Sequence, residues 1–220
     1  IAISQIGHGA HALCAEGEAV IFQIDCTSLA DAVIGNADKG ISSIADLKGK
    51  KVAATSGTSA EIILNLALKS AGLTSDDLEI VEMDANGMVS AMVSGNVDAC
   101  ATWSPGTVTI SEALGDKTVW LATNQDYINE ATFPSSFITT QKYADEHHDV
   151  LVRFSRALQK AADYRNEHIE EVAEMVAKQC EVDASTMLAC VGEGNWTITS
   201  DFQKKALEDG TIQKYYENQQ

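Results

Sequence analysis

The sequence predicts an α/β protein of two lobes, each a mostly parallel sheet flanked by helices. Two observations predict this class. Short apolar runs alternate with helical patterns through most of the first 125 residues, which is typical of βαβ units. After about residue 148, apolar side chains instead recur at the i, i+3/i+4 spacing of buried helices. The chain therefore changes from alternating elements to helices alone.

The elements can be assigned in chain order. Before residue 50 the patterns predict strands at 1–6 and 19–24, a helix at 10–15, an extended piece at 32–35 and a short helix that begins at Ser43 and stops at Gly49. A more regular set follows, with strands at 51–55, 78–83, 97–103 and 119–122 and helices at 60–71 and 88–93. One more strand at 136–140 precedes the helices.

This order predicts how the lobes are divided. Residues 45–130 form an α/β lobe that is inserted between an N-terminal piece, 1–44, and a largely helical piece, 131–220. The outer pieces together form lobe 1, and the inserted segment forms lobe 2. Two crossovers between the lobes imply a hinge, and the absence of a Pro/Gly/Ser linker implies that the lobes enclose a cleft.

Composition excludes several classes of function. The 220 residues carry 15 basic and 32 acidic side chains, a formal net charge of −17, and the basic residues form no cluster. Such a charge repels phosphate backbones and anionic headgroups, so neither nucleic acid nor a membrane surface is an expected partner. No apolar run reaches the roughly 18 residues that a membrane-spanning helix needs.

The most informative motif follows the strand at 51–55. Ser56, Gly57, Thr58 and Ser59 place small donors at the start of an amphipathic helix, and Thr58 with Glu61 matches the capping box. A helix N-terminus at the carboxyl end of a strand favours an anion or another polar ligand. Capping alone is the competing interpretation.

A second glycine-rich loop follows the first strand. Gly7 and His8 open the sequence GHGAHA, which formally fits G-x-G-x-x-A, and Asp25 ends the next strand. The helix after the motif is too short for a dinucleotide-binding crossover, so a ligand loop with Gln5 or His8 in the cleft is favoured. A solvated loop is the alternative.

Two further segments are candidates for ligand contact. Trp103 ends the strand at 97–103, where an aromatic ring suits stacking or a lid, although core packing explains it equally well. Ser135 lies where the chain returns to the first lobe, so its hydroxyl could reach the cleft. Asp84 and Asp25 are weaker candidates.

Catalytic and metal sites have no support. G-x-S-x-G, Walker A and H-E-x-x-H motifs are all absent. His8, His11 and Cys14 would diverge around a helix, so no metal is expected. The five cysteines form no C-x-x-C pair, and Cys180 with Cys190 is the one pair to consider for a disulfide.

Several segments together resemble a known family, the substrate-binding proteins of ABC importers for aliphatic sulfonates, nitrate, taurine and thiamine precursors. The similar segments are IADLKGKKVA at 44–53, SGTS at 56–59, SGNVDA at 94–99, TWSP at 102–105, IGHGA at 6–10 and YADEHHDV at 143–150. They occur in the family's order. His148 stands where the family usually has proline.

The resemblance implies a fold and a function. It implies the two-lobed "Venus flytrap" of type II periplasmic binding proteins, without catalysis, cofactor or metal. It further implies a monomer that captures a small anionic or zwitterionic solute between its lobes for a membrane permease, in the periplasm or as a cell-surface lipoprotein. Carried over by position, the ligand contacts are Gly7, His8, residues 56–59 and Trp103. Family members also have a portion that precedes the segment matching Ile1.

Two other classes of function remain open. The effector-binding domain of a transcription regulator shares the two-lobed architecture and predicts a helix-turn-helix upstream. An enzyme that uses NAD or converts a pyrimidine precursor predicts nucleotide binding or turnover. The native N-terminal extension would separate the first of these from an importer protein, which predicts a signal peptide or a lipoprotein cysteine there.

Overall fold

The computed structural model describes residues 3–6, 14, 17, 19–128, 130–192 and 199–217. The chain forms two compact units. Unit 1 contains Ile1–Ser28, Asn129–Ala184 and Gly194–Gln220, and unit 2 contains Leu29–Ile128 and Ser185–Glu193. Sheets flanked by helices confirm the α/β class. Unit 2 begins at Leu29, earlier in the chain than the boundary that the sequence predicts after residue 44.

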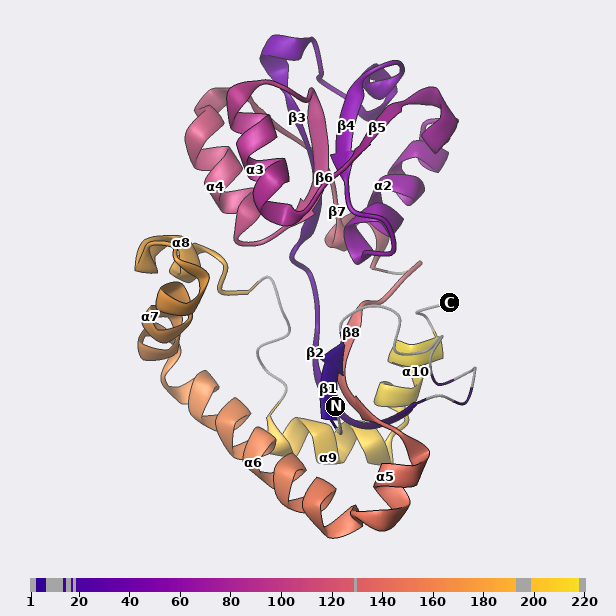
Figure 1. Ribbon diagram of the computed structural model, residues 1–220, viewed down its shortest axis with the longest axis vertical. Helices are drawn as coiled ribbons and strands as arrows, with labels where there is room; N and C mark the ends of the chain where they lie inside the picture. Colours follow the sequence, from indigo (N-terminus) through magenta and orange to yellow (C-terminus); the bar gives the residue numbers. More distant parts are fainter. Residues whose placement is uncertain are drawn as a thin grey trace. The chain divides into compact units, whose positions relative to one another are not determined.

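Unit 2 is built on a five-stranded sheet in the order β5-β4-β6-β3-β7 (Figure 1). Its strands are β3 (Asp31–Asn36), β4 (Lys51–Ala54), β5 (Glu79–Glu82), β6 (Ala99–Trp103) and β7 (Thr118–Thr123). β4 pairs in parallel with β5 and with β6, whereas β3 runs antiparallel to both β6 and β7. β4, β5, β6 and β7 therefore run in one direction and β3 runs against them, so this sheet is mostly parallel, as predicted, with one antiparallel strand.

Three helices cover the two faces of this sheet: α2 (Ser59–Ser70), α3 (Ala85–Ser94) and α4 (Gly106–Leu114). Figure 1 shows α3 and α4 side by side on one face and α2 on the other. Between the sheet and α3 with α4 lies a buried cluster that includes Ala32, Ile34, Met92 and Ile110. Val33 alternates with these β3 residues and is also fully buried. The sheet is thus buried on both faces.

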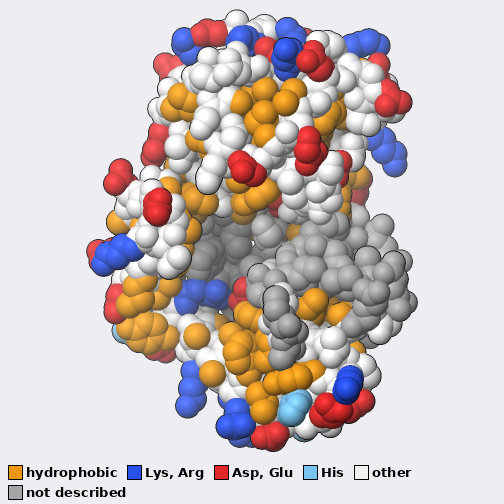
Figure 2. Space-filling view, viewed as in Figure 1, with side chains coloured by type: hydrophobic (Ala, Val, Ile, Leu, Met, Phe, Trp, Pro, Cys, Tyr) orange, Lys and Arg blue, Asp and Glu red, His pale blue; other side chains and the backbone are white. Residues whose placement is uncertain are grey.

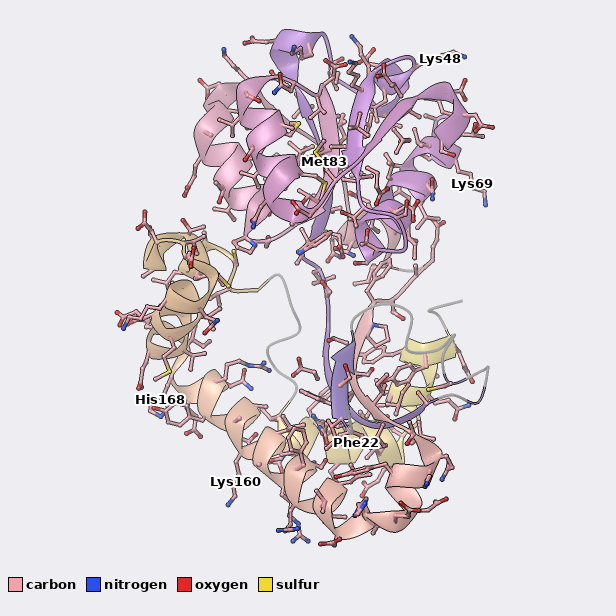
Figure 3. The ribbon with its side chains drawn as sticks, in the orientation of Figure 1. Phe22, Lys48, Lys69, Met83, Lys160 and His168 are labelled. Atoms are coloured by element: carbon pink, nitrogen blue, oxygen red, sulfur yellow. The ribbon has the colours of Figure 1, made fainter. Side chains whose placement is uncertain are left out.

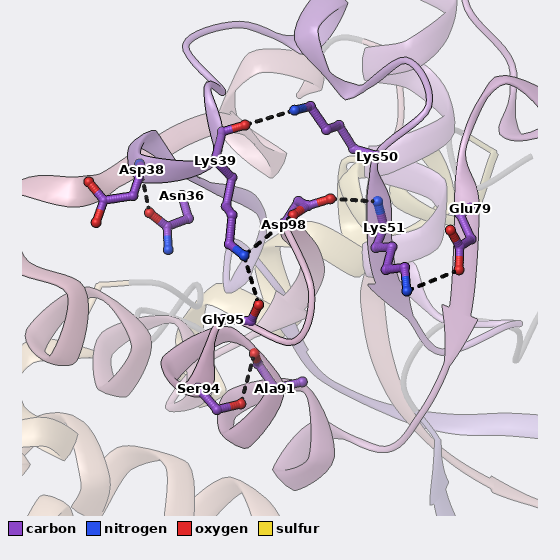
Figure 4. Close-up of polar contacts among 10 residues, drawn as sticks. All are labelled: Asn36, Asp38, Lys39, Lys50, Lys51, Glu79, Ala91, Ser94, Gly95 and Asp98. Carbon is purple, nitrogen blue, oxygen red and sulfur yellow. Dashed lines mark hydrogen bonds and ion pairs between the residues drawn. The ribbon is translucent and has the colours of Figure 1, made fainter.

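A polar network fixes the amino ends of β4 and β6 (Figure 4). Asp98 accepts the backbone N–H of Lys51 at 2.9 Å, and the Lys39 ammonium lies 4.0 Å from the other Asp98 oxygen. The same ammonium donates to the Gly95 carbonyl at 2.9 Å. Gly95 ends α3 with a φ of +72°, which favours glycine. Parts of the SGNVDA segment therefore have structural roles at this end of the sheet.

Unit 1 contains a three-stranded sheet, β1-β8-β2, with bounds Ile3–Ile6, Pro134–Thr139 and Val20–Thr27. Both β1 and β2 run antiparallel to β8, so the prediction of a mostly parallel sheet is wrong for the sheet of unit 1. The chain leaves unit 1 through β2 and returns through β8, and neighbouring strands joined in this way run in opposite directions.

Helices follow β8 along the chain: α5 (Gln141–Glu146), α6 (His148–Glu167), α7 (Ile169–Cys180), α8 (Ala184–Ala189), α9 (Ser200–Glu208) and α10 (Thr211–Glu217). Within unit 1, α6 packs on the sheet through aromatic rings. Phe154 lies edge-on to Phe22 of β2 and Phe137 of β8, with ring centroids 6.2 and 5.9 Å apart. Phe22 is labelled in Figure 3.

The surface and the cysteines bear on the sequence predictions. On the face shown in Figure 2, lysine and arginine side chains lie singly among acidic ones and form no broad basic patch. In the described part of the chain, no helix combines the length and apolar character needed to cross a membrane. Cys180 is exposed and Cys190 is buried, and no disulfide joins these two residues.

Candidate functional site

The predicted ligand residues of unit 2 lie along one edge of its sheet. The loop 56–59 follows β4, Trp103 ends β6, and Met83, labelled in Figure 3, follows β5. Because β3 is antiparallel to β6, its first residue pairs with the last residue of that strand, Asp31 with Trp103. The carboxyl ends of β4, β5 and β6 and the amino end of β3 therefore share this edge.

The donors of Ser56 are directed at a carboxylate. Glu82, at the end of β5, accepts the Ser56 backbone N–H at 2.9 Å and the Ser56 hydroxyl at 2.8 Å. These two hydrogen bonds stabilise the ionised carboxylate and hold the pKa of Glu82 below its usual range, the backbone N–H having the larger effect. The Glu82 carboxylate thus accepts the Ser56 hydrogen bonds that the sequence suggested for a bound anionic ligand.

Thr58 caps the start of α2 as predicted, but the Glu61 carboxylate accepts from Gly57, one residue before the N-cap residue that a capping box uses. The Thr58 hydroxyl oxygen accepts the Glu61 backbone N–H at 3.3 Å and donates its own proton to the Thr55 carbonyl at 2.7 Å. The Glu61 carboxylate reaches back to the Gly57 N–H at 2.8 Å. Gly57 has a φ of +76°, which only glycine adopts readily. The loop is therefore held by its own helix as well as by β5.

A hydrogen-bonded trio connects the partly exposed Ser59 to the buried Asp31 and Asn124 at two strand ends. The Ser59 hydroxyl donates to Asp31 Oδ1 at 2.7 Å, and the Asn124 side-chain amide donates to Asp31 Oδ2 at 2.9 Å. In return, Asn124 Oδ1 accepts the Asp31 backbone N–H at 2.7 Å. Asp31 and Asn124 are only 2% and 1% exposed, so the charge is held by hydrogen bonds and not by water.

Trp103 is partly buried and packs against the apolar cluster beneath α3 and α4. The next residue continues the edge, because Ser104 N–H donates to the Ala30 carbonyl at 3.1 Å and its hydroxyl lies 2.6 Å from Thr107 Oγ1. The structure thus assigns Trp103 a packing role. Ligand contact through the remaining exposed part of the ring stays a prediction.

The other predicted residues belong to unit 1. Gln5 lies in β1 opposite Phe137, but its side chain, like Gly7 and His8, lies outside the described residues. Ser135 lies in β8 and is 8% exposed. Its fully buried neighbour Ser136 makes a 2.6 Å hydrogen bond with the Tyr216 hydroxyl, and burial raises the pKa of Tyr216. Ser135 and Ser136 therefore belong to unit 1 and not to the edge of unit 2.

Three residues of the edge escaped the sequence analysis: Asp31, Glu82 and Asn124. Each lies at a strand end that faces the expected ligand edge. Glu82 and Asn124 fell among polar residues with no motif. Asp31 precedes the extended piece predicted at 32–35, and it could have been found only if that piece had been assigned to the same sheet as β6.

The arrangement is suited to holding a small polar molecule. Helix geometry leaves the first amides of α2 without intrahelical acceptors, and the Ser59 side of that turn is partly exposed. All five histidines lie at positions outside unit 2, so no Ser–His pair exists within it. Among the residues that the structure describes, no group of three or more His, Cys, Asp or Glu side chains could hold a metal ion.

Two relatives support the predicted resemblance. A protein of Brucella abortus (strain 2308), provisionally named a binding protein, is 36% identical over 94% of this chain and 64% of its own length. A protein of Bacillus subtilis (strain 168), provisionally named an aliphatic sulfonates-binding protein, is 29% identical over 84% of this chain and 55% of its own. The chain thus spans less than two thirds of the length of either relative.

Solved structures share the fold. The alkanesulfonate-binding protein SsuA from Xanthomonas axonopodis pv. citri, solved bound to MOPS, aligns with a TM-score of 0.73 and 16% identity, over all of this chain and 77% of that one. The desulfurization enzyme DszB also aligns, with a TM-score of 0.62 and 16% identity, over 92% of this chain and 72% of its own. The fold alone therefore does not distinguish binding from catalysis.

A family model described as NMT1/THI5 like matches residues 25–172, which is more than half of the chain. The match includes all of the edge described above, from Asp31 to Asn124. This chain belongs to the NMT1/THI5-like family.

Proposed function

We propose that the chain belongs to the solute-binding component of an ABC importer and binds a small organic molecule with an anionic group, of the sulfonate or taurine type. The observation that carries the proposal is the 29% identity, over 84% of this chain, to a relative named as an aliphatic sulfonates-binding protein. The start of α2 supports it, because helix N-termini attract anionic groups.

The proposal includes binding without turnover. Both relatives carry the names of binding proteins, and unit 2 offers no histidine to activate its serines. The importer's permease would be the partner, and the protein would act as a monomer in the periplasm or on the cell surface. Recovery of a bound sulfonate unchanged after prolonged incubation, measured by NMR, would support this part. Conversion of the sulfonate would favour an enzyme like DszB.

The first experiment is a binding panel on the full-length protein. Thermal unfolding is followed with ethanesulfonate, taurine, nitrate, a pyrimidine and NAD. A ligand at one hundred times its Kd stabilises the folded state by about 2.7 kcal/mol, which is readily measured. We expect stabilisation by a sulfonate and none by NAD. The proposal is wrong if neither ethanesulfonate nor taurine shifts the midpoint.

A pair of variants then tests the loop 56–59. Thr58→Asp and Thr58→Asn both retain a good N-cap, so α2 should form in each. Only aspartate adds a negative charge at the proposed anion position. We expect calorimetry to give sulfonate binding close to the native affinity for the asparagine variant, and at least tenfold weaker binding for the aspartate variant. Equal affinities would remove the loop from the proposed site.

A further inference from the structure

The trio of Asp31, Ser59 and Asn124 has a fixed direction of hydrogen bonding. Asn124 Oδ1 must face the Asp31 backbone N–H, because that donor cannot be reversed. The Asn124 amide nitrogen therefore faces Asp31 Oδ2, and Asp31 Oδ1 is left to accept from Ser59. A carboxylate only accepts hydrogen bonds, so the Ser59 proton is committed to Asp31.

This direction determines what Ser59 can offer to another molecule. Its hydroxyl has one proton and two lone pairs, and the proton is already used. Towards any third group, Ser59 Oγ is a hydrogen-bond acceptor. The sequence suggested that Ser59 donates a hydrogen bond to a bound anion. The structure instead leaves its hydroxyl oxygen to accept a hydrogen bond from a ligand group such as an ammonium or amine.

We propose that Asp31 is a positioning residue that makes Ser59 an acceptor, so that the edge selects a sulfonate that also carries an amine over one that lacks it. The inference rests on the proposed function and narrows its substrate class to zwitterions. Two carboxylates beside the loop, Glu61 and Glu82, add a negative electrostatic potential that also favours a ligand with an ammonium group. Asp31 acts through Ser59 and from a buried position, 2% exposed.

Taurine and ethanesulfonate are suitable probes, because they share a two-carbon sulfonate and differ only by the amine. The full-length protein should bind taurine more tightly by calorimetry. Asp31→Asn retains the shape of the side chain. Because the Asn124 amide still requires an oxygen opposite it, the new amide nitrogen must face Ser59, which then accepts and frees its proton. The preference for taurine should fall about tenfold, the value of one well-made hydrogen bond.

A double substitution restores the original direction. In Asp31→Asn with Asn124→Asp, the carboxylate at 124 accepts both the backbone N–H and the side-chain amide of residue 31. The asparagine oxygen then faces Ser59 again. We expect the native preference for taurine to return. A preference that stays low in the double variant overturns the proposal.

Ser59→Ala separates the hydroxyl from the charge of Asp31. It should lower the ratio of taurine affinity to ethanesulfonate affinity as much as Asp31→Asn does, and combining the two substitutions should lower this ratio no further. A full taurine preference in Ser59→Ala would overturn the inference. The ratio of the two affinities, measured on variants that unfold cooperatively, is a readout that loss of packing alone does not move.

The two proposals fail in different ways. If the native protein binds both probes equally, the role of Asp31 is wrong and sulfonate binding stands. If it binds neither probe, the proposed function is wrong and the inference falls with it.

Discussion

At the scale of single residues, carboxylates of unit 2 already occupy several donors of the loop 56–59. Glu82 takes both donors of Ser56, Glu61 takes the Gly57 N–H, and Asp31 takes the Ser59 proton. An anionic group that binds at this loop must compete with at least the exposed carboxylate of Glu82. The energetics of the site therefore depend on exchanging one anion for another.

Replacing Glu82 tests this competition. Glu82→Ala frees two donors of Ser56 and removes a negative charge, so we expect ethanesulfonate affinity to rise by about tenfold in calorimetry at low salt. Glu79→Ala is the matched control, because Glu79 lies at the other end of the same strand and pairs with Lys51. A similar gain in both variants would indicate a general effect of charge and not competition at Ser56.

At the scale of elements, each helix of unit 2 that begins at the ligand edge starts differently. Thr58 caps α2, and Pro105 precedes α4 without a side-chain cap. Asp84, a weak ligand candidate from the sequence, caps α3 by accepting the Gly87 N–H at 2.7 Å. An exposed carboxylate therefore caps a helix that packs on the buried apolar cluster of unit 2.

The cap of α3 makes a measurable contribution to stability. Asp84→Ala leaves the Gly87 N–H without its acceptor and should lower the free energy of unfolding by about 1 kcal/mol, as measured by urea denaturation. Asp84→Ser restores an N-cap and should recover most of this loss. If both variants lower the free energy of unfolding equally, the charge of Asp84 stabilises the protein and its capping hydrogen bond does not.

The elements also show what the sequence could predict. The strand at 51–55 and the helix at 60–71 were placed within a residue or two, because their apolar spacing and capping pattern agree. Helix α4 was missed, since its sequence GTVTISEAL is rich in β-branched residues that favour strands when considered locally. Its helical form depends on packing against the sheet, through buried Thr107 and Ile110.

Only the local part of the candidate site could be predicted from the sequence. The loop 56–59 is signalled by local chemistry, and its position after β4 was correct. The partners that orient it come from distant chain positions, 31, 82 and 124, and only the paired strands bring them together. No local pattern specifies such contacts, because they depend on strand order.

At the scale of the whole molecule, the net charge of −17 governs how solutes approach. Acidic side chains are scattered over the visible face in Figure 2 and produce a negative potential beyond the binding edge. A zwitterion with no net charge is not repelled by this potential as a whole, whereas a simple anion is. The charge therefore favours the same class of solute as the Asp31 and Ser59 arrangement.

Association rates should show this difference. Raising the ionic strength from about 0.01 M to 0.15 M shortens the screening length from about 30 Å to 8 Å. We expect the association rate of ethanesulfonate to increase over this range and that of taurine to change little, by stopped-flow measurement on the full-length protein. Equal salt dependence for both would mean that the overall charge does not influence capture.

The antiparallel placement of β3 has a consequence for biosynthesis. All six of its residues are buried, yet both of its partner strands, β6 and β7, lie far downstream, at residues 99–103 and 118–123. During synthesis β3 therefore leaves the ribosome before β6 and β7 have been made. While β4 and β5 emerge, the backbone N–H and C=O groups on both sides of β3 have no partner strand. Exposed strand edges in incomplete chains associate with one another. The segment DAVIGN is thus where we expect a nascent chain to need protection by a chaperone.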